Sequence, residues 1–105
     1  MDTHNSQITP DQARAARALV EVSLENIAQT AGLEPGQIHG FEYGHHSIDA
    51  ASTERLQRAL EHYGAVFIPE DEKRGVGVRL KHNASKARSL KRWENEGGPV
   101  AADDI

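Results

Sequence analysis

The chain has 105 residues, of which 37% are hydrophobic and 27% are charged, and its net charge at neutral pH is −4. This composition is ordinary for one small globular domain, and the length is too short for two separate hydrophobic cores. Cysteine is absent, which excludes disulfide bonds and cysteine-ligated metal sites. Because the first residues lack a signal-peptide pattern and no segment reaches the roughly 18 apolar residues of a membrane span, we expect a cytoplasmic protein without membrane contact.

We expect residues 1–8 to form a flexible N-terminus and the first helix to begin at about Pro10. Thr9 can accept a hydrogen bond from a free amide of the first turn, and Gln12 can complete a capping box. Proline suits the first helical position because its missing N–H would have no partner there. Helical spacing predicts that the buried side of this helix consists of Ala13, Ala16, Leu19 and Val20.

Two short helices are predicted next. Ser23 has the residue type of an N-cap, so the second helix should begin directly after it. Its apolar positions at helical spacing are Leu24, Ile27, Ala28 and Ala31. Gly32 suits the left-handed conformation that ends a helix, and Pro35 suits the start of the next one. So short a connection makes the two helices pack at a steep angle and projects the second one outward.

The third helix should cover residues 35–43, with Gly44 after its end and with Ile38 and Phe41 buried. A fourth helix is predicted over residues 50–63, ended by Gly64. Its apolar face would consist of Leu56, Ala59, Leu60 and Tyr63. Residues 9–64 are therefore predicted to form a compact helical domain, and the fold class is mainly α.

A β-hairpin is predicted after the helices. Residues 65–68 and 75–80 are rich in residues that favour strands, and the charged segment 69–74 between them has the composition of a turn. An isolated two-stranded hairpin is only marginally stable in water. We therefore expect residues 65–81 to pack on the helices or to pair with the same element of a second subunit.

Residues 82–105 are polar, and we expect them to form a disordered tail with a transient helix over residues 84–94 that would dock Leu90 and Trp93.

Six basic residues between positions 79 and 92 have no acidic residue among them. A basic stripe of this kind is either a solvated polar tail or a source of phosphate contacts. The possible phosphate contacts are Lys73, Arg74, Arg79 and Lys81. By contrast, residues 9–64 carry four basic and eight acidic residues.

Four short motifs lie in the helical region: Arg-Ala-Leu-Val at 17–20, Ile-Ala at 27–28, Ala-Gly-Leu at 31–33 and Ile-His-Gly-Phe-Glu-Tyr-Gly at 38–44. With these motifs, residues 9–64 resemble the lambda-repressor/Cro-like (XRE) family of helix-turn-helix transcriptional regulators. The resemblance covers about half of the chain. It implies a domain of four to five helices that binds double-stranded DNA as a homodimer, with the third helix in the major groove. The C-terminal hairpin is similar to that of small bacterial members.

The resemblance also assigns roles to single positions. It places Pro35, Gly36 and Gly40 where the third helix would contact bases, and none of these has a side chain that can hydrogen-bond a base. Leu24 stands where the family usually has a phosphate-contacting glutamine, and Glu34 has the wrong charge to face a phosphate. The remaining candidates for DNA contacts are Ser23, Gln37, His39, Tyr43, His45 and His46.

Arg17 and Glu42 have a structural interpretation. In the family that the chain resembles, the glutamate of the Phe-Glu-x-Gly motif commonly pairs with an arginine of the first helix. The resemblance therefore implies an ion pair between Arg17 and Glu42 that holds the fold. No catalytic motif is recognised, so we expect no enzymatic activity and no cofactor. Six histidines without cysteine give little support to a metal site.

Two functions remain open from the sequence. The first is a transcriptional regulator that binds operator DNA. The second is a degenerate helix-turn-helix that binds a protein partner, as an anti-activator or corepressor docked on a basic transcription factor. Its contact surface would combine acidic residues with Leu24, Pro35 and Tyr43.

Overall fold

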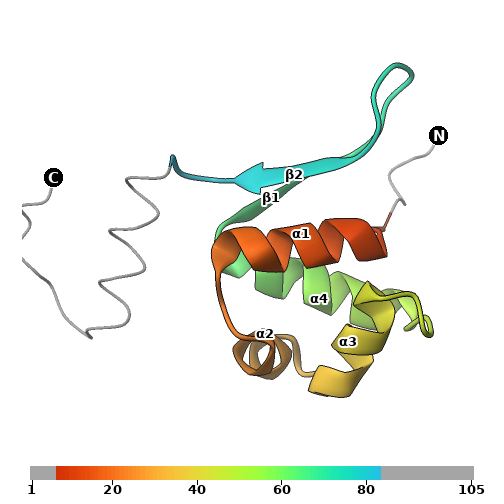
Figure 1. Cartoon of the computed structure of the whole chain (residues 1–105), viewed down its shortest axis with the longest axis vertical. Coiled ribbons are helices and arrows are strands. Elements are labelled where there is room, and N and C mark those ends of the chain that lie inside the picture. The colour runs from red at the N-terminus through yellow and green to blue at the C-terminus, as the bar shows by residue number, and fades with distance from the viewer. Residues whose placement is uncertain (1–6, 84–105) are drawn as a thin grey trace, which may run out of the picture.

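Four helices and a two-stranded antiparallel sheet make up residues 7–83, the part of the chain that the computed structural model describes (Figure 1). In chain order the elements are α1 (Pro10–Val20), α2 (Leu24–Ala31), α3 (Pro35–Glu42), α4 (Ala50–His62), β1 (Ala65–Ile68) and β2 (Gly77–Leu80). The predicted mainly helical fold with a C-terminal hairpin is therefore confirmed. The expectations for residues 1–6 and 84–105, including the helix over residues 84–94 and the docking of Leu90 and Trp93, fall outside the described residues.

The start of α1 is fixed by the predicted capping box. The backbone N–H of Gln12 donates to Thr9 Oγ1 at 3.0 Å, and the backbone N–H of Thr9 donates to Gln12 Oε1 at 3.0 Å. The prediction for Leu19 is wrong, since 40% of this residue is exposed. Consecutive helical residues are about 100° apart, and the buried side of α1 centres on Ala13, Ala16 and Val20, so Leu19 lies at its edge.

Glycines end the two short helices as predicted. Gly32 follows α2 with a left-handed φ of 73°, and Gly44 lies beyond α3 with φ of 75°. At the end of α3, the N–H of His45 donates to the carbonyl of Gly40 at 2.8 Å, and that of Gly44 donates to Phe41 at 3.1 Å. This pattern satisfies carbonyls of the last turn, so α3 stops at Glu42, one residue earlier than predicted.

The core lies between the helices and one face of the hairpin. Its fully buried large apolar side chains are Ile27, Ile38, Leu56 and Leu60. Tyr63, predicted on the buried face of the fourth helix, is only partly buried. It packs against the core while its hydroxyl lies 3.0 Å from Thr30 Oγ1. Each helix thus contributes its apolar face, and polar edges remain at the surface.

The hairpin packs on α1 and α4, which is one of the two arrangements predicted for it (Figure 1). The register pairs Ala65 with Leu80 and Ile68 with Gly77. The second strand begins at Gly77, not at residue 75 as predicted. The next pair outward would contain Pro69, which has no N–H to donate, so the ladder ends where β1 ends.

Gln12 connects α1 to this hairpin. Its Nε2 donates to the carbonyl oxygens of Gly77 at 2.9 Å and Ile68 at 3.4 Å, which are the last pair of the ladder. Gln12 is buried. Because the same side chain accepts a hydrogen bond in the capping box, all its polar groups have partners.

Candidate functional site

The outward side of α3 is the surface that the sequence predicts to be functional. Ile38, Phe41 and Glu42 are buried, whereas Gly36 and His39 are exposed on the other side of the helix. Figure 1 places α3, together with α2, on the side of α1 away from the hairpin. We name the exposed residues of this helix and the loop after it the α3 surface. It consists of Gly36, Gln37, His39, Tyr43, His45 and His46.

Three of these side chains form a ring cluster. The His39 ring centroid lies 4.8 Å from that of Tyr43 and 6.3 Å from that of His45. The guanidinium carbon of Arg14 lies 5.3 Å from the centre of the Tyr43 ring, within the range of a cation–π interaction. Half of Tyr43 is exposed. The α3 surface therefore combines aromatic and imidazole rings with one cation at its C-terminal end.

His46 lies across α3 at Gly40. A β-carbon at Gly40 would overlap the imidazole ring of His46. Gly40 is buried although it shares a helix side with exposed Gly36, while His46 remains exposed. Of the three positions that the resemblance assigns to base contacts, Gly36 is open to solvent, Pro35 is partly buried and Gly40 is covered.

The start of α3 holds one of its polar side chains in place. Gln37 Oε1 accepts a hydrogen bond from the backbone N–H of Glu34 at 2.9 Å. The amide nitrogen of Gln37 is the end that donates hydrogen bonds. Gln37 is exposed, and Glu34, at the N-cap, is exposed beside it. A donor and an acidic group therefore lie together at the N-terminal end of the α3 surface.

Arg17 and Glu42 form the ion pair that the resemblance implies. Arg17 Nε lies 2.8 Å from Glu42 Oε2, and Nη2 donates to Oε1 at 2.9 Å. The Glu42 side chain is only 1% exposed. The hydrogen bonds to Glu42 raise the pKa of Arg17, although the partial burial of Arg17 acts to lower it. The one acidic residue within α3 is thus directed into the molecule and paired.

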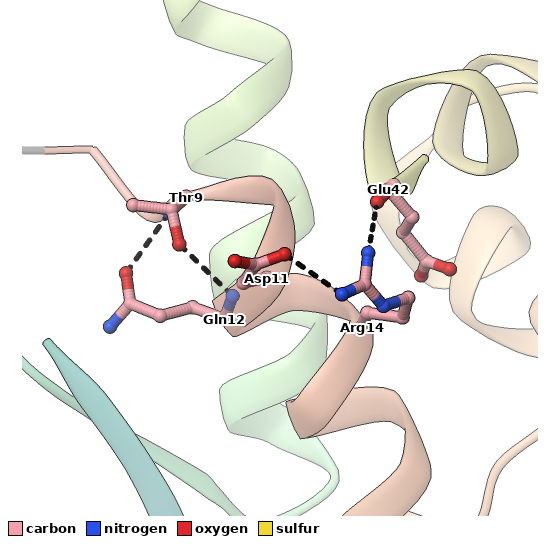
Figure 2. A network of polar contacts seen from close by, with 5 residues as sticks. All are labelled: Thr9, Asp11, Gln12, Arg14 and Glu42. Carbon is pink, nitrogen blue, oxygen red and sulfur yellow. Dashed lines mark hydrogen bonds and ion pairs between the residues drawn. The ribbon is translucent and has the colours of Figure 1, made fainter. Parts of the chain in front are cut away.

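Arg14 fastens the same end of α3 to α1. Its Nη1 donates to the backbone carbonyl of Glu42 at 2.7 Å, and its Nη2 pairs with Asp11 at 2.8 Å (Figure 2). Arg55 of α4 contacts the end of α2, where its Nε donates to the carbonyl of Ala31 at 3.0 Å. These two arginines were not predicted as site residues, because the sequence around them carries no local signal of these contacts.

Ser23 and Leu24 have structural roles. Ser23 Oγ accepts a hydrogen bond from the backbone N–H of Asn26 at 3.1 Å and caps α2. Leu24 is partly buried and packs against the core. The apolar side chain at this position therefore contributes to the packing of the fold.

The four predicted phosphate contacts lie on the hairpin. Lys73 and Arg74 belong to the turn, where their backbone N–H groups donate to Asp71 Oδ1 at 2.8 Å each. Arg79 and Lys81 are exposed on and after β2. Since the hairpin packs on the side of α1 away from α3 (Figure 1), one copy of the chain does not bring these four cations to the α3 surface.

No family model matches the chain, and no curated protein matches it. Comparison with known proteins therefore does not assign the chain to a family. Within residues 7–83, no helix has the length and apolar character needed to cross a membrane. The same residues contain no group of three or more histidine, aspartate or glutamate side chains placed to hold a metal ion. The α3 surface remains the candidate site.

Proposed function

We propose that the protein is a DNA-binding transcriptional regulator in which α2 and α3 act as a helix-turn-helix and α3 enters the major groove. The observation that carries this proposal is the geometry of the helix pair. Three residues connect two helices of eight residues each, and Gly36, Gln37 and His39 of α3 are exposed. A major groove about 12 Å wide admits one such helix.

The distribution of charge supports the same conclusion. Glu42 is buried in its pair with Arg17, so it adds no negative charge to the α3 surface. Glu34 is the acidic residue that borders this surface at its N-terminal end. Arg14 contacts the last residue of α3, and Arg55 contacts the last residue of α2. The α3 surface as defined above therefore carries no acidic side chain, although exposed Asp49 follows it in the same loop, and this favours approach to phosphates.

The side chains available for base contacts include an amide and imidazoles. The Gln37 amide can donate to an adenine or guanine acceptor, and His39 can donate or accept. A good bidentate contact discriminates between bases by about 1–3 kcal/mol. With so few contacts from one copy, we infer that two copies bind paired half-sites, as in dimeric helix-turn-helix proteins.

The alternative function is binding of a protein partner through a surface that includes Leu24, Pro35 and Tyr43. The packing of these residues within the chain weighs against it. Leu24, one of its three apolar contacts, packs against the core. The remaining two are Pro35, which is partly buried, and Tyr43, whose ring already contacts His39 and Arg14. The apolar area available to a partner is therefore small.

The decisive experiment is a selection of DNA by the full chain. A random duplex pool is enriched for binding, and fluorescence anisotropy then compares the enriched duplex with a scrambled one from low to physiological salt. Tighter binding of the enriched duplex supports the proposal. If no DNA binds at low salt, where non-specific attraction is strongest, the proposal is wrong.

Two variants locate the interface. The paired substitutions Q37A and H39A change the α3 surface, and K73A with R74A change the hairpin turn. We expect the first pair to abolish the preference for the enriched duplex. The second pair should leave that preference intact, because the turn lies away from α3 (Figure 1). If K73A with R74A abolishes the preference while Q37A with H39A retains it, the DNA interface lies on the hairpin.

A further inference from the structure

The place of Gly40 on α3 is unusual for a buried residue. It lies one helical turn after Gly36, which is exposed and has open space around the position of a β-carbon. The residues of α3 that face the core are Ile38, Phe41 and Glu42, and position 40 points away from the middle of this group. The core therefore does not bury Gly40, and the covering group comes from outside the helix.

That group is the imidazole of His46. Its ring atoms occupy the space into which any side chain at position 40 would extend. The chain returns to α3 because Gly44 adopts a left-handed φ of 75°. The backbone N–H groups of His45 and His46 then donate to the carbonyl of Gly40, at 2.8 Å and 3.4 Å. Position 46 is thus fixed beside position 40 by the helix end itself.

We infer that His46 provides the base-contacting side chain that α3 lacks at Gly40. This inference rests on the proposed function, because it requires α3 to enter the major groove. His46 is an exposed residue whose ring lies against α3 at Gly40, and imidazole nitrogens can donate and accept hydrogen bonds. The N7 and O6 acceptors of guanine are the major-groove groups that an imidazole N–H would contact.

Gly40 has a matching role in this arrangement. Only glycine leaves room for the His46 ring against the helix, since a β-carbon would overlap it. The absence of a side chain at a base-contacting position is then a requirement of the site. His46 contributes specificity, while the ring cluster of His39, Tyr43 and His45 lies on the same surface.

The test measures affinity for the duplex that the wild-type chain enriches from a random pool, and for a scrambled duplex. We expect H46A to bind the enriched duplex about tenfold more weakly, which corresponds to about 1.4 kcal/mol, with unchanged binding of the scrambled duplex. H62A is the matched control, because His62 is an exposed histidine on α4 outside the α3 surface. It should leave both affinities unchanged.

G40A gives an independent test that leaves His46 in the chain. The added methyl group displaces the imidazole, so G40A should lose as much specific affinity as H46A, and the double variant should lose no more than either. Thermal unfolding of each variant checks that the fold is intact. If H46A and G40A retain full specificity, the inference is wrong while the proposed function stands. If the wild-type chain enriches no duplex, the proposed function itself is wrong, and the inference about His46 fails with it.

Discussion

Arg17 holds the carboxylate of Glu42 with two hydrogen bonds of 2.8 Å and 2.9 Å, although only 1% of the Glu42 side chain is exposed. The pair joins the last turn of α1 to the last residue of α3. Arg14, one turn earlier on α1, donates to the backbone carbonyl of the same glutamate. Two arginines of one helix therefore set the position of the helix that carries the candidate site.

Replacement of Arg17 should destabilise the fold strongly. In R17M the carboxylate of Glu42 stays buried without its partner, and breaking a buried pair in this way costs about 3 kcal/mol or more. The free energy of unfolding in urea measures this loss. R58M is the matched control, since Arg58 pairs with Glu54 at the surface and exposed pairs contribute at most about 1 kcal/mol. Equal losses in the two variants would contradict this interpretation.

Two substitutions of Gln12 separate its roles. Q12A removes its hydrogen bonds and should cost about 1–3 kcal/mol. Q12E keeps the acceptor for the N–H of Thr9 but places a carboxylate beside the carbonyl oxygens of Gly77 and Ile68. We expect Q12E to be less stable than Q12A in urea unfolding near neutral pH. A Q12E variant as stable as the wild-type chain would show that the contact to the hairpin contributes nothing.

Gly36 offers a substitution that should improve the helix and weaken binding. A β-carbon there meets no atom within 4 Å, so G36A should raise the free energy of unfolding by about 0.5–1 kcal/mol through helix propensity. If the α3 backbone approaches DNA closely at this point, the same variant binds the enriched duplex more weakly. Higher stability together with unchanged affinity would place Gly36 outside the interface.

The N-cap of α4 predicts a dependence of stability on pH. Hydrogen bonds from the hydroxyl and the backbone N–H of Ser52 lower the pKa of Asp49 below its ordinary value of 3.8. A group with a lowered pKa stabilises the folded chain above the unfolded value, and this contribution is lost as the pH falls through the folded value. D49N keeps a capping side chain without the charge.

We therefore expect the wild-type chain to melt at a higher temperature than D49N near neutral pH. The difference should shrink as the pH falls below 3.8. Other carboxylates, including Asp71, titrate in both proteins, so the comparison isolates Asp49. A constant difference between the two melting temperatures down to the most acidic condition would exclude this contribution.

Local signals in the sequence predicted most of the fold. Thr9 with Gln12 defines the start of α1 by residue type alone, and Gly32 and Gly44 mark helix ends through the conformation that only glycine adopts readily. These features depend on a few neighbouring residues. Leu19 shows the limit, because its exposure depends on how far other elements cover α1, and spacing within one helix does not contain that information.

The candidate site was predictable as a list of residues but not as an arrangement. The resemblance put His39 and Tyr43 among the candidates for DNA contacts, and their rings do make contact. The position of His46 over Gly40 depends on the path of the loop after the helix. The contact of Arg14 with Tyr43 joins residues far apart in the chain. Such contacts follow from tertiary packing and leave no local pattern.

Gln12 also links two segments that lie at opposite ends of the described chain. One side chain completes the cap of the helix and contacts the outermost pair of the β ladder. Fraying of the first helical turn and opening of the hairpin at Gly77 would each break hydrogen bonds of this same side chain, so the segments around Thr9 and Gly77 are energetically coupled.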